Sequence, residues 1–423
     1  MSGGLRELCR RHPALCSIRP IGRSRAGEPL DLVSIGGDGG GGGGGARGHA
    51  LVVGGPHANE PAGLLTVLRL ATLLCADPAR RAGLTWHFIG CLDPDGARLN
   101  EGWYGGPYTV AHHHRHFYRP AMGRQPEWTF PIETGPRRFD RPLPETLALR
   151  RVIDELRPVF MCSLHNADFG GAYFQVSRRV PGLAAELAAI AESHGVPLDL
   201  APIDTVGYAS AGPGVSLLPS ADRIDFAETA EQAGAPRPYG ASSWQYADRY
   251  GTFTLIAEVP LWVSPGCDDR SPAGLTRGQL VKSAAVRLRE EIEPLAWLRA
   301  ETRTRCVADT PFHAAVDDTL AVSRLLVASL ELGVDQREPV SRAEAGGIND
   351  TVRRMPLRAA AMFARLLAAE PELATARAEV GGRLRRLCAA AQAEVVQLED
   401  PIGRITAIQT HAVLTAARRC LDR

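Results

Sequence analysis

The chain has 423 residues, of which 45% are hydrophobic, so it is long enough to bury a large core and to form more than one domain. Its 48 basic and 47 acidic residues leave a formal net charge of +1, which does not favour nucleic acid as a partner. Nine cysteines are scattered without a CxxC pair, and no apolar stretch is long enough to cross a membrane. We therefore expect a cytoplasmic protein with reduced thiols and no membrane span.

Helices and strands alternate in the first part of the chain. A short helix over residues 5–12 precedes a strand over residues 29–35. Seven consecutive glycines, Gly39 to Gly45, then predict a flexible hairpin loop. A phosphate-binding loop is disfavoured because its lysine and its glycine spacing are missing. A second buried strand, a helix and a third strand follow at residues 49–55, 61–75 and 84–92.

The segment from residue 93 to about residue 144 is rich in Gly, Pro, Arg and aromatic residues and lacks clear periodicity, so we expect a long functional loop region. Further elements are predicted after it: a helix over 144–157, a strand over 158–164, a helix over 182–195 and a β-rich run over 251–262. This alternation predicts an α/β fold with a mixed, largely parallel central sheet flanked by helices.

Beyond residue 300 the strand signal fades, and the chain becomes rich in Ala, Leu, Arg and Glu at helical spacing. We expect about four helices there, with breaks near Pro339, Pro356, Pro371 and Pro401. The predicted organisation is a catalytic domain over residues 1–300 and a small all-α C-terminal domain or cap over residues 301–423. The 17 Arg against 16 Asp and Glu of the second part favour neither nucleic acid nor a membrane, so we expect packing on the first domain or a homo-oligomer interface.

Three side chains suited to a metal follow predicted strands. In "LVVGGPHANEPAGLL", His57 and Glu60 stand three positions apart just after a buried strand, and His165 follows the apolar run "MCSL". Hydrolytic zinc usually has three such ligands, and sites in open α/β sheets collect beyond the carboxyl ends of the strands. Glu258 lies in the apolar run "LIAEVPLW", where a carboxylate needs a partner or a function. Taken singly, each residue also fits a structural role.

The order of these motifs resembles the zinc metallocarboxypeptidases of the carboxypeptidase A type, the M14 family, over roughly residues 20 to 300. The resemblance implies Zn²⁺ held by His57, Glu60 and His165, with Glu258 as the catalytic glutamate. "DPDG" at residues 93–96 resembles the NPDG turn of the family, and "YGASSWQY" resembles the loop before its catalytic glutamate.

The same resemblance suggests residues that contact the substrate. "HHHRHFYRP" is similar to the LNRNF segment, which places Arg115 on the arginine that clamps a substrate carboxylate, with His114 in place of the neighbouring asparagine. Arg119 is a second candidate in that segment. Arg98 is a candidate for the arginine that faces the oxyanion, although it follows the DPDG turn sooner than in the family. Tyr239 is the nearest counterpart of the substrate-pocket tyrosine, in a shifted position.

Several departures and alternatives stay open. "FYRPAMGRQPEWTFP" is not part of the general family pattern and suggests a subgroup with its own substrate. The run of His112, His113, His114 and His116 could instead form a separate metal site, but consecutive histidines point in different directions. Asp168 and Asp95 could orient a ligand histidine or could be turn residues. Cys162 could be a soft ligand, but a buried apolar cysteine is the simpler interpretation.

The function implied by the resemblance is a zinc-dependent hydrolase of amide bonds. In it, Glu258 takes a proton from the attacking water and passes it to the leaving amine. The first choice of substrate is a peptide or peptide-like small molecule with a free carboxylate, which loses its C-terminal residue. A deacylase of small N-acyl amino acids would use the same site. A binding protein that kept the fold without the chemistry is the third hypothesis, which the complete set of ligands and base disfavours.

Overall fold

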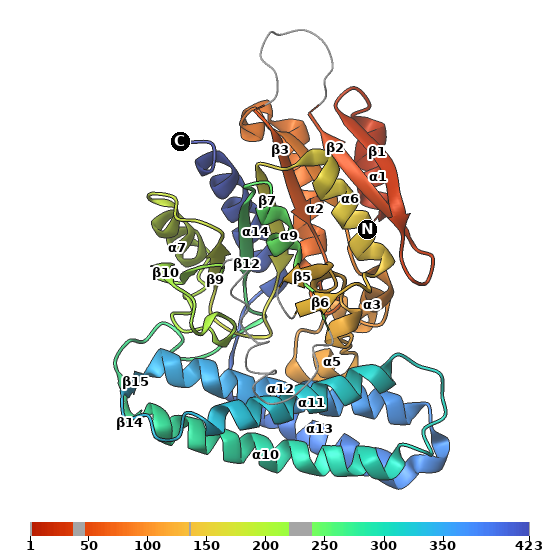
Figure 1. Ribbon diagram of the computed structural model, residues 1–423, viewed down its shortest axis with the longest axis vertical. Helices are drawn as coiled ribbons and strands as arrows, with labels where there is room; N and C mark the ends of the chain where they lie inside the picture. Colours follow the sequence, from red (N-terminus) through yellow and green to blue (C-terminus); the bar gives the residue numbers. More distant parts are fainter. Residues whose placement is uncertain (1, 37–46, 135–136, 220–238, 423) are drawn as a thin grey trace.

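The computed structural model describes residues 2–36, 47–134, 137–219 and 239–422. A sheet-bearing part contains most of the strands, and a layer of long helices lies across one end of it (Figure 1). The strands are β1 (Cys16–Arg23), β2 (Pro29–Ile35), β3 (His49–Val53), β4 (Thr85–Ile89), β5 (Ile132–Thr134), β6 (Arg137–Phe139), β7 (Phe160–His165), β8 (Phe169–Gly170), β9 (Tyr173–Val176), β10 (Ser210–Gly212), β11 (Val215–Leu217), β12 (Phe253–Glu258), β13 (Trp262–Val263), β14 (Pro272–Thr276), β15 (Pro339–Ser341) and β16 (Val396–Gln397).

Helices cover both faces of the sheet and build the separate layer (Figure 1). The α-helices are α1 (Ser2–Arg11), α2 (Ala62–Ala76), α3 (Pro94–Arg98), α4 (Glu101–Tyr104), α5 (Val110–Arg115), α6 (Pro144–Leu156), α7 (Leu183–Ser193), α9 (Ser243–Asp248), α10 (Arg277–Thr302), α11 (Phe312–Glu331), α12 (Arg342–Ala368), α13 (Ala374–Glu394) and α14 (Pro401–Arg419). Short 3₁₀ turns are η1 (Pro78–Arg81), η2 (Met122–Arg124), η3 (Pro126–Trp128), η4 (Ile203–Thr205) and η5 (Pro371–Leu373).

Within the described residues, nine strands form the central sheet in the order β1-β2-β4-β3-β7-β12-β9-β11-β10. Strands β4, β3, β7 and β12 run parallel at its centre, and antiparallel pairs flank them. This mixed sheet between helices confirms the predicted fold class. The predicted hairpin is wrong, because β4 lies between β2 and β3. An all-apolar strand such as β3 is best buried between parallel neighbours. The seven glycines themselves lie outside the described residues.

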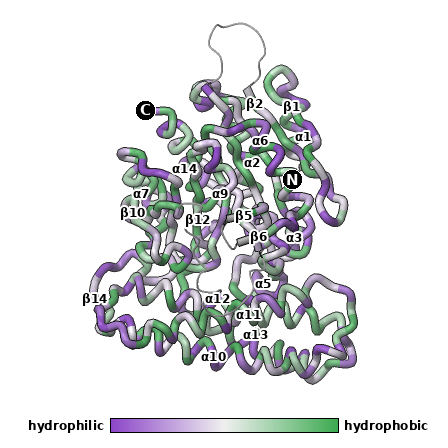
Figure 2. The backbone as a smooth tube through the Cα atoms, in the orientation of Figure 1, coloured by the Kyte–Doolittle hydropathy of each residue, from purple (hydrophilic) through white to green (hydrophobic). Residues whose placement is uncertain are grey.

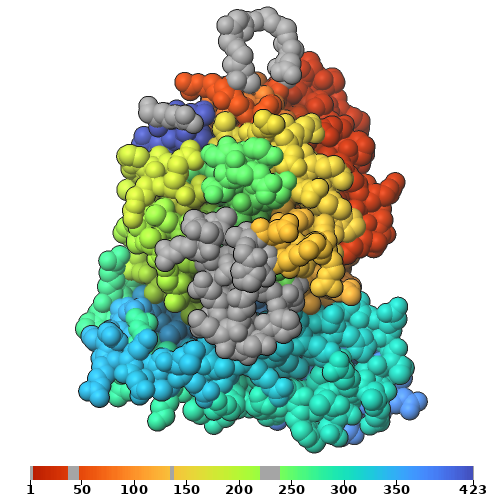
Figure 3. Space-filling model, viewed as in Figure 1, coloured from red at the N-terminus to blue at the C-terminus, as the bar shows by residue number. Residues whose placement is uncertain are grey.

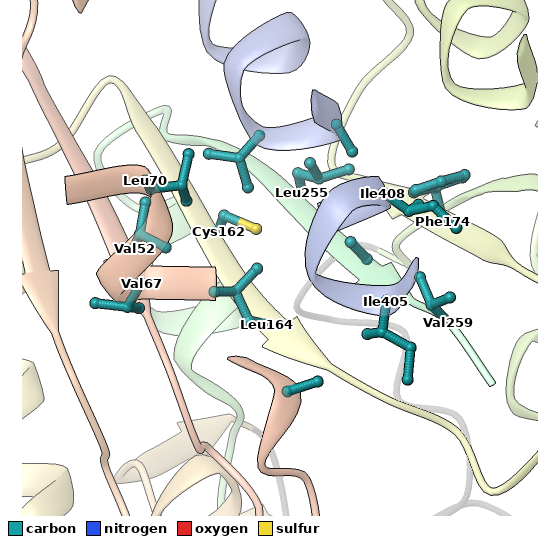
Figure 4. Close-up of a cluster of buried hydrophobic side chains, with 14 of the residues drawn as sticks. Val52, Val67, Leu70, Cys162, Leu164, Phe174, Leu255, Val259, Ile405 and Ile408 are labelled. Atoms are coloured by element: carbon teal, nitrogen blue, oxygen red, sulfur yellow. The ribbon is translucent and has the colours of Figure 1, made fainter. Parts of the chain in front are cut away.

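Alternate residues of the central strands pack on opposite faces of the sheet. In β3, Ala50 and Val52 belong to the core beneath α1, α2, α7 and α14, whereas Leu51 and Val53 belong to the core beneath α6 and α9. This is the period of two that a strand imposes on its side chains. Figure 4 shows the first core, where Ile405 and Ile408 of α14 meet side chains of the strands.

Helices α10 to α13 form the layer and have their own apolar core (Figures 1 and 3). Hydrophilic and hydrophobic residues alternate along them, as expected for helices with one face buried (Figure 2). The packing differs from the predicted division at residue 300: α10 already begins at Arg277, and α14 returns to the sheet. Pro356 does not break α12, whose second half is held by buried residues such as Met362 and Phe363. Among the described helices, none combines the length and apolarity that a membrane span needs.

Some elements were missed from the sequence. The expected loop region from residue 93 to residue 144 contains the short helices α3, α4 and α5, the turns η2 and η3, and the β5–β6 pair. Strands β8 to β11 have only two to four residues each and give too few positions for a period to show.

Helix α14 is fastened to the centre of the sheet by one buried amide. Gln409 Nε2 donates to the carbonyl oxygens of His165 (2.6 Å) and Ala257 (3.4 Å), and Gln409 Oε1 accepts from the Thr66 hydroxyl (2.7 Å). One side chain thereby joins α14, α2, β7 and β12 where the buried interior offers no water in exchange.

We predict that Gln409→Leu destabilises the protein by about 1–3 kcal/mol, because the buried carbonyl oxygens and the Thr66 hydroxyl lose a partner. The urea midpoint, followed by circular dichroism, should fall. The matched control is Arg418→Gln on the exposed side of α14, which should stay within about 0.5 kcal/mol of the parent. Equal midpoints for both variants would contradict the role given to Gln409.

Candidate metal centre

The candidate site lies at the carboxyl ends of three neighbouring parallel strands. β3 ends at Val53, four residues before His57, while β7 ends at His165 and β12 ends at Glu258. The register of β7 and β12 sets His165 directly opposite Glu258. Strand pairing alone thus brings together residues that lie about two hundred positions apart in the chain.

Two glycines between β3 and His57 are required by close packing. A Cβ on Gly54 would lie 2.7 Å from the carbonyl oxygen of Gly90 and 2.9 Å from that of Gly63. Gly55 has a φ of +54°, and a Cβ there would meet Leu64 at 2.8 Å. The chain therefore turns sharply beneath α2, and His57 and Glu60 follow on that turn.

His57, Glu60 and His165 form a buried cluster in which one potential ligand atom from each lies within 4.8 Å of the others. It is the one such group of His, Cys, Asp and Glu found in the part of the chain that the structure describes. His165 Nδ1 lies 2.9 Å from Glu60 Oε2, and its Nε2 lies 3.0 Å from the Ser163 hydroxyl. The Ser163 contact orients the ring so that Nδ1 faces the cluster.

These residues fit a zinc ion. Two histidines and one carboxylate are a known donor set for catalytic zinc, which keeps a further position open. His57 Nδ1 is buried and has no hydrogen-bond partner among the described residues. A buried polar atom of this kind is costly unless it has a ligand. The expected metal ligands are therefore brought together with a free donor atom on His57.

Burial and mutual contact shift the pKa values of the cluster. Burial, reinforced by Arg119, lowers the pKa of His57 well below its ordinary value. Burial alone would raise the pKa of Glu60, but His57, His165 and Arg119 outweigh it and lower that pKa. Burial also lowers the pKa of His165, but the hydrogen bond and charge of Glu60 raise it to about 9 overall. A divalent cation would favour the deprotonated form of each ligand.

Glu258 stands beside the cluster as an unpaired carboxylate. Its Oε1 lies 3.9 Å from His165 Nδ1, and its side chain is 15% exposed. Burial raises its pKa to about 8, an effect that the charge of His165 partly opposes. A carboxylate with a raised pKa next to a metal site has the properties of a general acid and base.

The structure separates the three candidate arginines. Arg119 Nη1 donates to Glu60 Oε1 (2.9 Å) and to Asn59 Oδ1 (3.0 Å), so Arg119 is at the cluster. Arg115 is exposed on α5, on the side of Cys388 in α13. The segment after α5 turns inward, which brings the residue four positions later to the site. This geometry corrects the assignment of the carboxylate-clamping role to Arg115.

Arg98 is also remote from the cluster. It lies on α3, and its Nε and Nη2 bind Glu28 Oε1 at 2.9 and 2.6 Å in an exposed ion pair. The early position of Arg98 after the DPDG turn keeps it on the outside of the short helix that this turn starts. The predicted oxyanion contact of Arg98 is not supported by this placement.

His114 and Tyr239 have other neighbours. His114 is fully buried, with its Nδ1 2.9 Å from the Val110 carbonyl oxygen and its ring stacked on Phe117. The half-buried Tyr239 has its ring 6.2 Å from that of Trp128. The remaining alternatives also have structural partners: the histidine run forms no three-ligand group in the described chain, Asp95 accepts from Ser24 and Ala26, and Cys162 is buried in the core.

Sequence reasoning missed a buried carboxylate near the cluster. Glu127, in the segment that departs from the family pattern, accepts a hydrogen bond from the Ser243 hydroxyl at 2.6 Å. Its other oxygen, Oε2, is buried without a partner in the described residues, and its charge acts on His165. Burial raises its pKa above the ordinary value. The departure itself was the available signal, but nothing in the sequence indicated where Glu127 would point.

Residues 2–174 match the zinc carboxypeptidase family (Peptidase_M14). Over these residues the chain is a zinc carboxypeptidase relative. The match confirms the predicted resemblance and carries with it the class of zinc hydrolase. The zinc carboxypeptidase region contains His57, Glu60 and His165, whereas Glu258 and the helical layer lie beyond it. None of the curated proteins matches the chain.

Solved structures with a similar fold include a metallopeptidase from Shewanella amazonensis, described as putative in its own name (17% identity, 61% of this chain and 83% of that chain, TM-score 0.42). Others are the carboxypeptidase A of Helicoverpa armigera (16%, 61% and 62%, TM-score 0.38) and the murein-tripeptide amidase MpaA of Escherichia coli O157 (20%, 58% and 83%, TM-score 0.29). Likeness at this level does not define a substrate.

We predict that the purified protein binds about one Zn²⁺ per chain through His57, Glu60 and His165. His165→Ala should weaken zinc binding by more than about 100-fold, since even residues that only support a ligand are worth 10–100-fold. Competition with a chromogenic chelator measures the affinity. His112→Ala, in the histidine run, is the matched control and should bind zinc as the parent does. Zinc affinity that is unchanged in His165→Ala would show that the ligand assignment is wrong.

Proposed function

We propose that the protein is a zinc-dependent hydrolase that removes the C-terminal residue from a peptide or peptide-like small molecule. The observation that carries this proposal is the buried group of His57, Glu60 and His165 with Glu258 fixed beside it by strand register. The family match over residues 2–174 supports the same reaction class.

Bound zinc would lower the pKa of water and polarise the scissile carbonyl. The protein residues do the rest. Glu258 accepts a proton from the attacking water at Oε1 or Oε2 and later donates it to the leaving amine. Its raised pKa suits both steps near neutral pH, because the group can then hold and release a proton with little driving force either way. Ser163 holds His165 in its orientation throughout.

Arg119 is the proposed contact for the carboxylate of the substrate. Its Nη1 already binds the carboxylate of Glu60, and its side chain keeps 19% exposure. The guanidinium can therefore bind a second carboxylate from the open side while Glu60 is engaged by the metal. The backbone N–H of Arg119 contacts Met362 of α12 at 3.4 Å, which helps to fix the segment.

A deacylase of small N-acyl amino acids is the second candidate. The observation that favours it is Glu127, a second buried carboxylate near the cluster in the segment that departs from the family pattern. A non-catalytic binding protein would not need Glu258 to be kept unpaired. We further propose a cytoplasmic location, no nucleic-acid or membrane partner, and self-association through the C-terminal helices.

The role of Glu258 predicts the effect of Glu258→Gln. The amide keeps the shape of the side chain but cannot accept the proton, so kcat should fall by roughly 10²–10⁴ while zinc remains bound. Turnover of a small library of acylated dipeptides and acylated amino acids is compared with zinc content. Near-parental turnover with bound zinc would exclude Glu258 as the base.

The placement of Arg119 predicts which arginine recognises a free carboxylate. The parent should prefer a peptide acid to its amide. Arg119→Ala should lose that preference and raise KM at least as much as it lowers kcat, since the contact exists in both ground and transition states. Steady-state kinetics on matched acid and amide substrates measure this.

Arg115→Ala is the matched control for that experiment, because Arg115 is exposed on α5 in the same segment. It should keep the preference of the parent. Loss of preference in Arg115→Ala alone would restore the assignment made from the sequence. A parent enzyme with no preference for the acid would favour the deacylase.

A further inference from the structure

Helix α12, outside the region that matches the family, directs two arginines at the metal centre. Arg354 and Arg358 are four residues apart, so they lie on one face of the helix. Arg358 donates through Nε (3.0 Å) and Nη2 (2.8 Å) to Asp168 Oδ2, and Arg354 donates to both oxygens of Asp204 at 3.3 and 3.4 Å. Asp168 is three residues beyond His165, so α12 contacts the segment that carries a metal ligand.

These arginines interact electrostatically with the site itself. The charge of Arg358 acts on His57 and on Arg119. Asp204, the partner of Arg354, also accepts from the Tyr173 hydroxyl at 3.2 Å. Tyr173 is paired with Glu258 across the sheet. Arg354, Arg358 and Arg119 therefore surround the same space as the metal ligands and Glu258.

The arginines are deep but not sealed. The side chains of Arg358, Arg354 and Arg119 keep 13%, 16% and 19% exposure, close to the 15% of Glu258. Asp168, in contrast, is fully buried behind Arg358. Each guanidinium therefore presents a part of its surface to the solvent side of the site, where a bound molecule would lie.

The existing carboxylates do not fully satisfy these cations. Both hydrogen bonds from Arg358 end on Asp168 Oδ2, and Oδ1 has no partner among the described residues. Arg354 Nε is likewise buried without one. Burial lowers the pKa of Arg358 to about 10; Asp168 opposes the effect, and the charges of Arg354 and Arg119 add to it. An anion placed among the three guanidinium groups would offset this repulsion.

We propose that Arg358, supported by Arg354, binds a second anionic group of the substrate, so that the preferred leaving residue carries a side-chain carboxylate in addition to its α-carboxylate. This inference rests on the proposed function and deepens it. Arg119 would hold the α-carboxylate, and α12 would hold the acidic side chain. The C-terminal helical layer would then select the substrate of the catalytic region.

The competing interpretation is that the α12 arginines only attach the helical layer to the catalytic region. Arg365 has such a role, since its Nη1 donates to the carbonyl oxygens of Leu99, His116 and Phe117. Attachment predicts changes in stability with no change in the choice between acidic and neutral ligands. Recognition predicts a change in that choice.

The test uses N-acetylglutamate and N-acetylglutamine, which share the α-carboxylate and differ only in the side-chain charge. Isothermal titration calorimetry on the full-length protein, with and without added zinc, measures both affinities. The parent should bind N-acetylglutamate at least about 10-fold more tightly, the usual worth of one charge-assisted hydrogen bond or more. Arg358→Met should bind the two ligands about equally, and Arg358→Lys should keep part of the preference.

Arg377→Met, at an exposed position of α13, is the control and should keep the parental preference. Arg358→Met leaves Asp168 buried without its partner, so the double variant Asp168→Asn/Arg358→Met serves where the single variant does not fold. The double variant should also lose the preference. Hydrolysis of benzoyl-Gly-Glu and benzoyl-Gly-Gln by the same variants gives the corresponding ratio of kcat/KM.

Equal affinity of the parent for the two ligands would overturn the inference, whether or not the protein hydrolyses peptides. A preference that survives in Arg358→Met would also overturn it. Conversely, an Arg358-dependent preference in a protein that hydrolyses no peptide would support the anion site and reject the peptidase function. The two proposals can therefore fail separately.

Discussion

The parallel pairing of β3, β7 and β12 is the constraint on which the candidate site depends. Because these strands are neighbours and run in one direction, their carboxyl ends present His57, His165 and Glu258 at one edge of the sheet. The tight turn at Gly54 and Gly55 then adds Glu60. The apolar strands on both faces hold this edge rigidly, so the geometry of the polar groups is set by the hydrophobic core.

Gathering so many charged groups in one place is costly, and the surrounding elements offset the cost. Glu60 is shared by His165 and Arg119, while Asp168 and Asp204 are balanced by arginines from α12. A divalent cation among the ligands would complete this balance. The long helices are thus part of the electrostatics of the catalytic region, which explains why they pack across the end of the sheet where the polar groups lie (Figure 1).

The sequence predicted what local patterns determine. Apolar runs followed by polar residues placed His57, His165 and Glu258 at strand ends, and the structure brings them together. The choice between Arg115 and Arg119 depended on the direction of the chain after α5, which periodicity does not encode. The contact between Arg358 and Asp168 joins residues 190 positions apart and has no local signal. The short strands β8 to β11 were missed because they are defined by pairing rather than by pattern.

The bond from Gln409 to the carbonyl of His165 has a consequence for biosynthesis. The two residues are 244 positions apart, so the ribosome delivers the strand with the metal ligand long before the helix that fastens it. At about 5–20 residues per second, this interval lasts roughly 10–50 s. During that time β7 and β12 lack part of their cover, and the α12 arginines arrive only in its second half. A nascent hydrolase whose site is completed this late is inactive beside other unfolded chains, which it would otherwise degrade.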